Sequence, residues 1–262
     1  MNDRQLVRLE PSLRSKTIVK NYFDEDVAPG YDESSWPMFE PEFLDPMVDL
    51  LADLAGKWDP PTALELGIGT GRVALPLSRT GVAIHGIDLS EAMVTQLRKK
   101  PGAEEIGVTI GDFASTRVAG TFGLAYLVFN TIMNLTTKSA QVDCFKNAAT
   151  HLKPGGRFVV EVMLPELQWL PPGEKFRTSS VSATHLCIDE YDLANQGLTS
   201  HHYRFRDGAS EVHSVPFRFV WPAELDLMAQ LAGMVLEDRW AGWQREPFTA
   251  NSKSHVSVWR RG

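Results

Sequence analysis

Short apolar runs alternate along the chain with stretches in which apolar residues recur three and four positions apart. The runs end at glycine, asparagine or an acidic residue, which is typical of buried strands. Five such runs lie at 63–66, 81–88, 106–110, 124–129 and 157–161. The stretches between and around them predict helices, and the alternation favours a mostly parallel sheet of an α/β domain flanked by helices.

The pattern changes after residue 165. Residues 166–220 hold a proline-rich piece followed by β-like runs near 176–188, 197–206 and 210–220, with Asp207-Gly208 as a hairpin signal. This predicts an antiparallel insertion of roughly three strands. A further helix opens at Trp221-Pro222.

A glycine-rich loop follows the first predicted strand. Gly67, Gly69 and Gly71 stand as GxGxG within Ala63–Arg72, where a tight strand-to-helix turn needs residues that tolerate positive φ. The first N–H groups of the next helix are a ready site for polar or anionic ligand groups. The loop alone is also compatible with a plain structural turn.

Acidic residues end the next two strands. Asp88 lies 23 positions after Glu65, close to the roughly 20-residue gap that places an acid on a ribose in a βαβ unit. Asp112 follows the third strand in Gly111-Asp112-Phe113, and LKPGGRFVV forms a turn before the fifth. Taken in order over roughly residues 60–165, ELGIGTG, GIDLS, GDF and LKPGGRFVV resemble class I S-adenosylmethionine-dependent methyltransferases.

The resemblance implies a Rossmann-like seven-stranded sheet in which residues 235–240 and 255–260 form the antiparallel closing pair. It also implies a helical lid at the N-terminus. We therefore expect three parts: a lid over 1–40, a cofactor-binding methyltransferase domain over 41–165 and 221–262, and a β insertion over the active site at 166–220.

The same resemblance assigns cofactor contacts. Near the methionine portion it places Glu65, Gly67, Gly69, Gly71 and Phe129, with Tyr22 and Tyr31 of the lid. Asp88 would accept from the ribose hydroxyls and Asp112 from the adenine amino group, while Leu89, Met93 and Phe113 would pack on the adenine. The structural alternatives are turn or capping roles for the two aspartates and surface packing for the two tyrosines.

The acceptor side offers fewer signals. Methyl transfer needs donor and acceptor held close and aligned, since the cofactor carries the activated methyl group. Catalytic candidates are Tyr22, Tyr31, Asn134 and Glu161. Asn134 stands where some relatives that methylate sugar amines have a histidine base, and asparagine cannot take up a proton at neutral pH. An amine or phenolate acceptor would need no dedicated base.

Three histidines are weaker candidates. His85 lies mid-strand and is expected in the core. His201 and His202 are adjacent in a predicted strand, so one should face the pocket and the other solvent. Several rings could wall an enclosed pocket: Tyr22, Tyr31, Trp36, Phe129, Trp169, Tyr203 and Phe205. The alternative is that most of them, Tyr203 and Phe205 in particular, form the insertion's own core or a subunit interface.

Composition bears on the expected binding partners, the cellular location and metal binding. The net charge of −7 argues against binding to a polyanionic backbone, so no nucleic-acid partner is expected. No apolar run reaches the roughly 18 residues of a membrane span, and the start lacks a signal-peptide pattern, so a cytoplasmic location is expected. Cys144 and Cys187 match no metal or disulfide spacing, and no acidic cluster suggests Mg²⁺, so no metal is expected.

These observations predict S-adenosylmethionine-dependent methyl transfer to nitrogen, oxygen or carbon of a small, largely apolar or aromatic metabolite. Two alternatives stay open: a scaffold or non-methylating catalyst that binds the cofactor, and an NAD-dependent reductase, which would lack GxGxxG and a Tyr-x-x-x-Lys pair here. The insertion or the N-terminal segment could also mediate a homo-oligomer.

Overall fold

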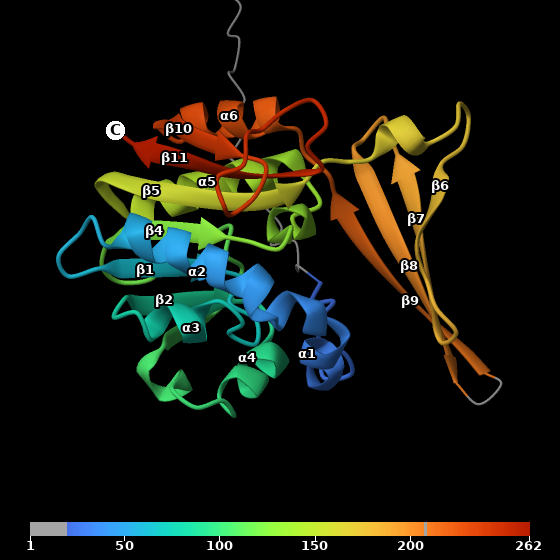
Figure 1. Cartoon of the computed structure of the whole chain (residues 1–262), viewed down its shortest axis with the longest axis horizontal. Helices are drawn as coiled ribbons and strands as arrows, with labels where there is room; N and C mark the ends of the chain where they lie inside the picture. The colour runs from blue at the N-terminus through green and yellow to red at the C-terminus, as the bar shows by residue number, and fades with distance from the viewer. Residues whose placement is uncertain (1–19, 207–208) are drawn as a thin grey trace, which may run out of the picture.

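The computed structural model describes residues 20–206 and 209–262 and contains two sheets (Figure 1). The larger has seven strands in the order β10-β11-β5-β4-β1-β2-β3. Its strands are β1 (Thr62–Leu66), β2 (Ala83–Asp88), β3 (Gly107–Ile110), β4 (Phe122–Leu127), β5 (Leu152–Met163), β10 (Met234–Trp240) and β11 (Ser254–Arg261). The first five are parallel; β11 is antiparallel to β5, and β10 to β11, which confirms the predicted closing pair.

Both faces of this sheet are buried because helices pack against each of them. The helices are α2 (Pro41–Ala55), α3 (Ala74–Ser78), α4 (Glu91–Leu97), α5 (Lys138–His151) and α6 (Pro222–Leu231). Since successive strand residues point to opposite sides, Leu64 and Leu66 of β1 join one apolar core with α5 and α6, whereas Ala63 joins another with α2 and α3. This arrangement is the predicted α/β fold.

The fourth strand ends two residues earlier than its apolar run suggests. β4 stops at Leu127, and Phe129 and Asn130 adopt left-handed backbone conformations with φ of 57° and 61°. Such conformations are uncommon for residues other than glycine and turn the chain sharply. The turn leads into the 3₁₀ helix η4 (Thr131–Asn134) at the carboxyl end of the sheet.

The smaller sheet is an antiparallel meander that stands off the carboxyl ends of the parallel strands (Figure 1). Its strands, in order, are β6 (Phe176–Val181), β7 (His185–Asp192), β8 (Gly197–Arg206) and β9 (Ala209–Arg218). The prediction of roughly three strands was wrong, because the run 176–188 is a hairpin. Its turn contains no glycine or proline; it is closed by Ser182, whose N–H donates to the carbonyl of His185 at 2.7 Å.

The last hairpin is closed at Arg206, which pairs with Ala209; the predicted turn residues Asp207 and Gly208 lie outside the described residues. At the other end of β9, buried Arg218 anchors the small sheet to two helices. Its guanidinium donates to Gln141 of α5 at 2.5 Å and to Glu224 of α6 at 2.6 Å.

The described part of the N-terminal segment forms three short helical turns, η1 (Ala28–Gly30), α1 (Tyr31–Ser34) and η2 (Trp36–Phe39). The helical pieces expected before residue 20 lie outside the described residues, as do the side chains of Trp36 and Trp169. In the part of the chain that is described, no helix combines the length and apolar character needed to cross a membrane.

Candidate active site

The glycine loop connects β1 to α3 with three residues at positive φ. Gly67, Gly69 and Gly71 have φ of 77°, 54° and 79°. A Cβ at Gly67 would lie 2.7 Å from the Thr131 side chain, so a larger residue would push into the turn after β4. Gly71 instead faces Leu97 of α4, which makes it a packing position.

Asp88 ends β2 beside this loop and is fixed on both carboxylate oxygens. Oδ2 accepts the N–H of Gly69 at 2.6 Å, and Oδ1 accepts the N–H of Ser90 at 2.8 Å. Burial raises the pKa of Asp88, while these backbone N–H groups act in the opposite direction. Ser90 in turn caps α4 by accepting the N–H of Met93, as the sequence predicts.

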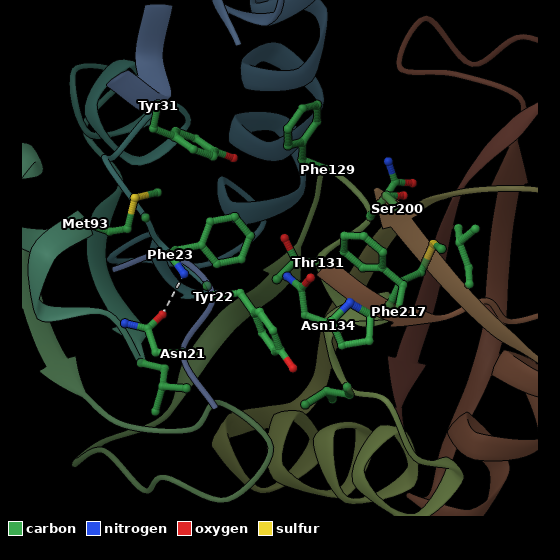
Figure 2. Close-up of a pocket in the computed structure, with 18 of the residues that line it drawn as sticks. Asn21, Tyr22, Phe23, Tyr31, Met93, Phe129, Thr131, Asn134, Ser200 and Phe217 are labelled. Carbon is green, nitrogen blue, oxygen red and sulfur yellow. Dashed lines mark hydrogen bonds between the residues drawn. The ribbon is translucent and has the colours of Figure 1, made fainter. Parts of the chain in front are cut away.

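A cavity of about 560 Å³ opens at the carboxyl ends of the parallel strands, between the N-terminal segment and the small sheet. In Figure 2, Tyr31 and Met93 lie on one side, Ser200 and Phe217 on the other, and Tyr22, Phe23 and Asn134 converge near the middle. Eleven of the residues that the sequence selects line this cavity: Tyr22, Tyr31, Gly67, Gly69, Asp88, Leu89, Met93, Asp112, Phe113, Phe129 and Asn134.

Three selected residues do not line it: Glu65, Gly71 and Glu161. Glu65 is buried beneath the loop and accepts the hydroxyl of Tyr126 at 2.9 Å. Burial raises the pKa of Glu65 to about 8, because a buried carboxylate loses its hydration. Direct cofactor contact by Glu65 or Gly71 therefore stays a prediction.

Glu161, on β5, acts on the cavity through its neighbours. Its Oε2 accepts the N–H of Phe129 at 2.8 Å, and its Oε1 accepts the indole N–H of Trp243 at 3.0 Å. The carboxylate thus holds the left-handed turn after β4, and with it the Phe129 ring that lines the cavity. The guanidinium of Arg72 lies 4.9 Å from the centre of that ring.

The N-terminal segment is tied to the cofactor-side loops by polar contacts. Asp32 accepts the hydroxyl of Thr70 at 2.6 Å and pairs with Lys100 at 2.5 Å. The Ser90 hydroxyl donates to the carbonyl of Phe23, whose ring packs edge-on against Tyr31 at 6.0 Å. Burial raises the pKa of the Tyr31 phenol. These contacts hold the aromatic rings over the cavity.

The cavity has further lining residues beyond the individual candidates named from the sequence; three of them, Asn130, Thr131 and Met133, belong to the segment 130–134, which the sequence places at the end of the fourth strand beneath the cofactor's sulfur. The further lining residues come from the start of the described chain, the turn after β4 with the end of β5, and one face of the small sheet: Lys20, Asn21, Phe23, Asn130, Thr131, Met133, Leu135, Met163, Ser179, Ser180, Cys187, Asp189, Leu198, Ser200, Pro216 and Phe217. Strand alternation predicts that Leu198, Ser200 and His202 share a face. It does not say which face meets the cavity.

The histidine pair behaves as alternation requires. His202 lines the cavity, whereas His201 contacts Ser214 at 2.8 Å and Glu190 at 3.4 Å on the other face of the sheet. His85 stays half-buried in β2, where its Nε2 lies 2.8 Å from the Thr109 hydroxyl. Tyr203 and Phe205 do not line the cavity.

An α/β sheet with a glycine loop, an acid after the second strand and a cavity at the carboxyl ends defines a nucleotide-type cofactor site. A family model described as a methyltransferase domain matches residues 63–156. The structure of the CcbJ methyltransferase from Streptomyces caelestis is 35% identical, with a TM-score of 0.79; the match covers 90% of this chain and 96% of that one. The chain belongs to the S-adenosylmethionine-dependent methyltransferases.

Two further relatives are informative. The cypemycin N-terminal methyltransferase of Streptomyces sp is 26% identical over 246 residues, covering 91% of this chain and 97% of that protein. The sugar N-methyltransferase KedS8 from Streptoalloteichus sp has a TM-score of 0.62 with 15% identity, covering 99% of this chain and 100% of that one, and shows the shared fold alone. Family membership makes this chain a methyltransferase and decides against the NAD-dependent reductase.

The residues present fit the cofactor. Gly67 leaves the loop free of a Cβ beside Thr131, and Asp88 presents a fixed carboxylate to the same cavity. S-adenosylmethionine supplies a methyl group on a positively charged sulfur. The protein's part is to bind it, to orient an acceptor against it and to manage the acceptor's proton.

Proposed function

We propose that this enzyme methylates a nitrogen atom of a small metabolite bound in the cavity. In this proposal Asp88 binds the ribose hydroxyls and Asp112 the adenine amino group. Leu89, Met93 and Phe113 flank the adenine ring. Gly67 and Gly69 approach the methionine portion, with Tyr22, Tyr31 and Phe129 around its sulfur.

The observation that carries the proposal is the continuity of the cavity. A single cavity includes Asp88 and reaches from Met93 on one side to Ser200 and Phe217 of the small sheet on the other (Figure 2). Its volume of about 560 Å³ lies within the range of small-molecule sites. The region between Asn134 and the small sheet is where an acceptor would meet the methyl group.

Nitrogen is favoured by a relative that matches most of the chain: the cypemycin enzyme is named an N-terminal methyltransferase. A neutral amine carries its own nucleophilic lone pair, so the site needs only to position it, and its proton leaves after the transfer. Such an acceptor is compatible with Asn134, which cannot act as a base.

The test is transfer of a labelled methyl group from S-adenosylmethionine to a panel of acceptors. The panel contains amino sugars, cyclic secondary amines, their hydroxyl counterparts, phenols, carboxylates and short peptides with free N-termini. We expect methylation of small amines and of no matched hydroxyl compound. Transfer only to phenols or carboxylates would overturn nitrogen as the acceptor, and transfer only to peptides would overturn the small-metabolite assignment.

A further inference from the structure

One face of the small sheet carries a polar patch into the cavity. Cys187 pairs across the strands with His202, and Asp189 with Ser200. Directly opposite residues of an antiparallel pair lie on the same face, and all four line the cavity. Below them the face is apolar, with Leu198 buried near the junction with the larger sheet.

Asp189 differs from the other two carboxylates of the cavity. Asp88 and Asp112 each accept backbone N–H groups close to their own strand ends. Asp189 instead accepts the hydroxyl of Ser200 at 2.5 Å and lies 4.0 Å from the sulfur of Cys187.

Within residues 20–206 and 209–262, no side chain forms a salt bridge with Asp189. Arg177, which stands opposite it on β6, pairs with Glu166 instead. The ion pairs that the small sheet makes there involve Glu166, Glu190 and Glu224. A carboxylate on the wall of a mainly apolar cavity attracts a cation, because such walls screen charge poorly. The wall therefore favours a positively charged acceptor group.

His202 stands next to this carboxylate and leads away from the cavity. Its Nδ1 lies 3.1 Å from Nε2 of His185, and the two rings stack at 5.3 Å. The other nitrogen of His185 lies 3.3 Å from the hydroxyl of Ser180, an exposed residue that also lines the cavity. The two imidazoles thus form a chain of exchangeable protons from the cavity toward solvent.

The surroundings favour the neutral form of the His202 imidazole, which is the form that can accept a proton. Burial lowers the pKa of His202, with smaller contributions from His185, His213 and Arg204, while Asp189 acts in the opposite direction. The other titratable groups on this face are Cys187, Glu211 and Arg177, and those that line the cavity elsewhere are Lys20, Tyr22, Tyr31, Asp88 and Asp112.

We infer that Asp189 and His202 form the acceptor-amine subsite, which rests on the proposed N-methylation. Asp189 binds the acceptor as its ammonium ion, and His202 takes one proton when the N–H bond breaks. The freed lone pair then forms the N–C bond to the methyl carbon, while the C–S bond breaks and its electron pair stays on sulfur. His202 passes its proton to His185 and so to solvent.

This subsite specifies the substrate class. The acceptor is a primary or secondary amine that is protonated in water, with its ammonium group near the small sheet. An acceptor that carries a carboxylate in this position is excluded by repulsion from Asp189. The subsite also supplies the proton acceptor that Asn134 cannot provide.

The experiment uses Asp189→Asn and His202→Gln, with Glu190→Gln and His201→Gln as controls on the opposite face of the same strands. Asp189→Asn should raise KM for a cationic amine about 10- to 100-fold, as expected for loss of a charged hydrogen bond, with a smaller change in kcat. His202→Gln should lower kcat about 100-fold. It should also shift the pH–rate profile toward higher pH, where the substrate amine is already deprotonated and needs no base. The controls should stay near wild type.

Binding readouts separate this inference from the proposed function. Calorimetry with S-adenosylhomocysteine should give unchanged affinity for every variant. Adding the amine to the wild type should shift the NMR signal of the His202 ring, identified by its loss in His202→Gln. Should Asp189→Asn fail to fold, this NMR shift decides alone, and its absence overturns the subsite.

If the wild type methylates no amine, the proposed function fails. If it methylates amines while Asp189→Asn and His202→Gln leave KM, kcat and the pH profile unchanged, the subsite alone is overturned.

Discussion

Replacing Asp88 by alanine should weaken cofactor binding without abolishing folding. The carboxylate accepts N–H groups from Gly69 at 2.6 Å and from Ser90 at 2.8 Å, so it is already oriented before any ligand arrives. Removing a charged acceptor that is fixed in this way costs roughly 1–3 kcal/mol for a ligand hydroxyl. That corresponds to about a 5- to 150-fold increase in Kd.

Calorimetric titration with S-adenosylhomocysteine measures this change directly. Asp88→Asn should lie between alanine and wild type, because an amide keeps one acceptor oxygen and the same shape. Asp143→Ala is the matched control: its side chain is 57% exposed on α5, 4.0 Å from Lys146, and does not line the cavity. Wild-type affinity in Asp88→Ala, within about twofold, would refute the ribose contact.

Three further predictions concern buried polar groups. Glu161→Ala leaves the N–H groups of Phe129 and Trp243 without their acceptor. The free energy of unfolding, measured by urea titration, should therefore fall by about 2–4 kcal/mol, and KM for the amine should rise. Unchanged stability would contradict this role of Glu161. Glu65 has a pKa of about 8 in the folded state and an ordinary pKa of 4.5, so between these pH values the folded state binds more protons than the unfolded state. Stability should therefore fall as the pH rises from 4.5 to about 8. Glu65→Gln should remove this dependence. Burial lowers the pKa of His255 from 6.5 to about 4, so on acidification the unfolded state takes up the proton before the folded state does. Stability should therefore fall as the pH drops from 6.5 toward 4. An equally large fall in His255→Gln would show that another group causes this pH dependence.

Much of the larger sheet could be predicted because its signals are local. The apolar runs, the caps and the glycine loop are each set within about ten residues of chain, and Ser90 shows this well: its capping role follows from sequence position alone. The end of β4 was misjudged because Phe129 is apolar but left-handed. Its conformation depends on Glu161, 32 residues away, which no local pattern reveals.

For the site as well, residues with local sequence signals could be selected and residues placed by distant contacts could not. Residues that line the cavity from the motif loops, such as Asp88 and Asp112, follow strand ends and could be selected from the sequence. Asp189 could not be, and His202 could be selected only as one of a pair with His201, because their place in the cavity depends on how the small sheet is held by Arg218 against α5 and α6. Alternation alone limits the choice to one of two faces.

A crystal structure with S-adenosylhomocysteine and a small cationic amine tests the central claim most directly. The account predicts the ribose on Asp88, the sulfur facing Asn134, and the amine nitrogen between that sulfur and the polar patch of Asp189 and His202. A cofactor product bound away from Asp88, or an amine that lies outside the cavity with its nitrogen turned from the sulfur, would contradict it.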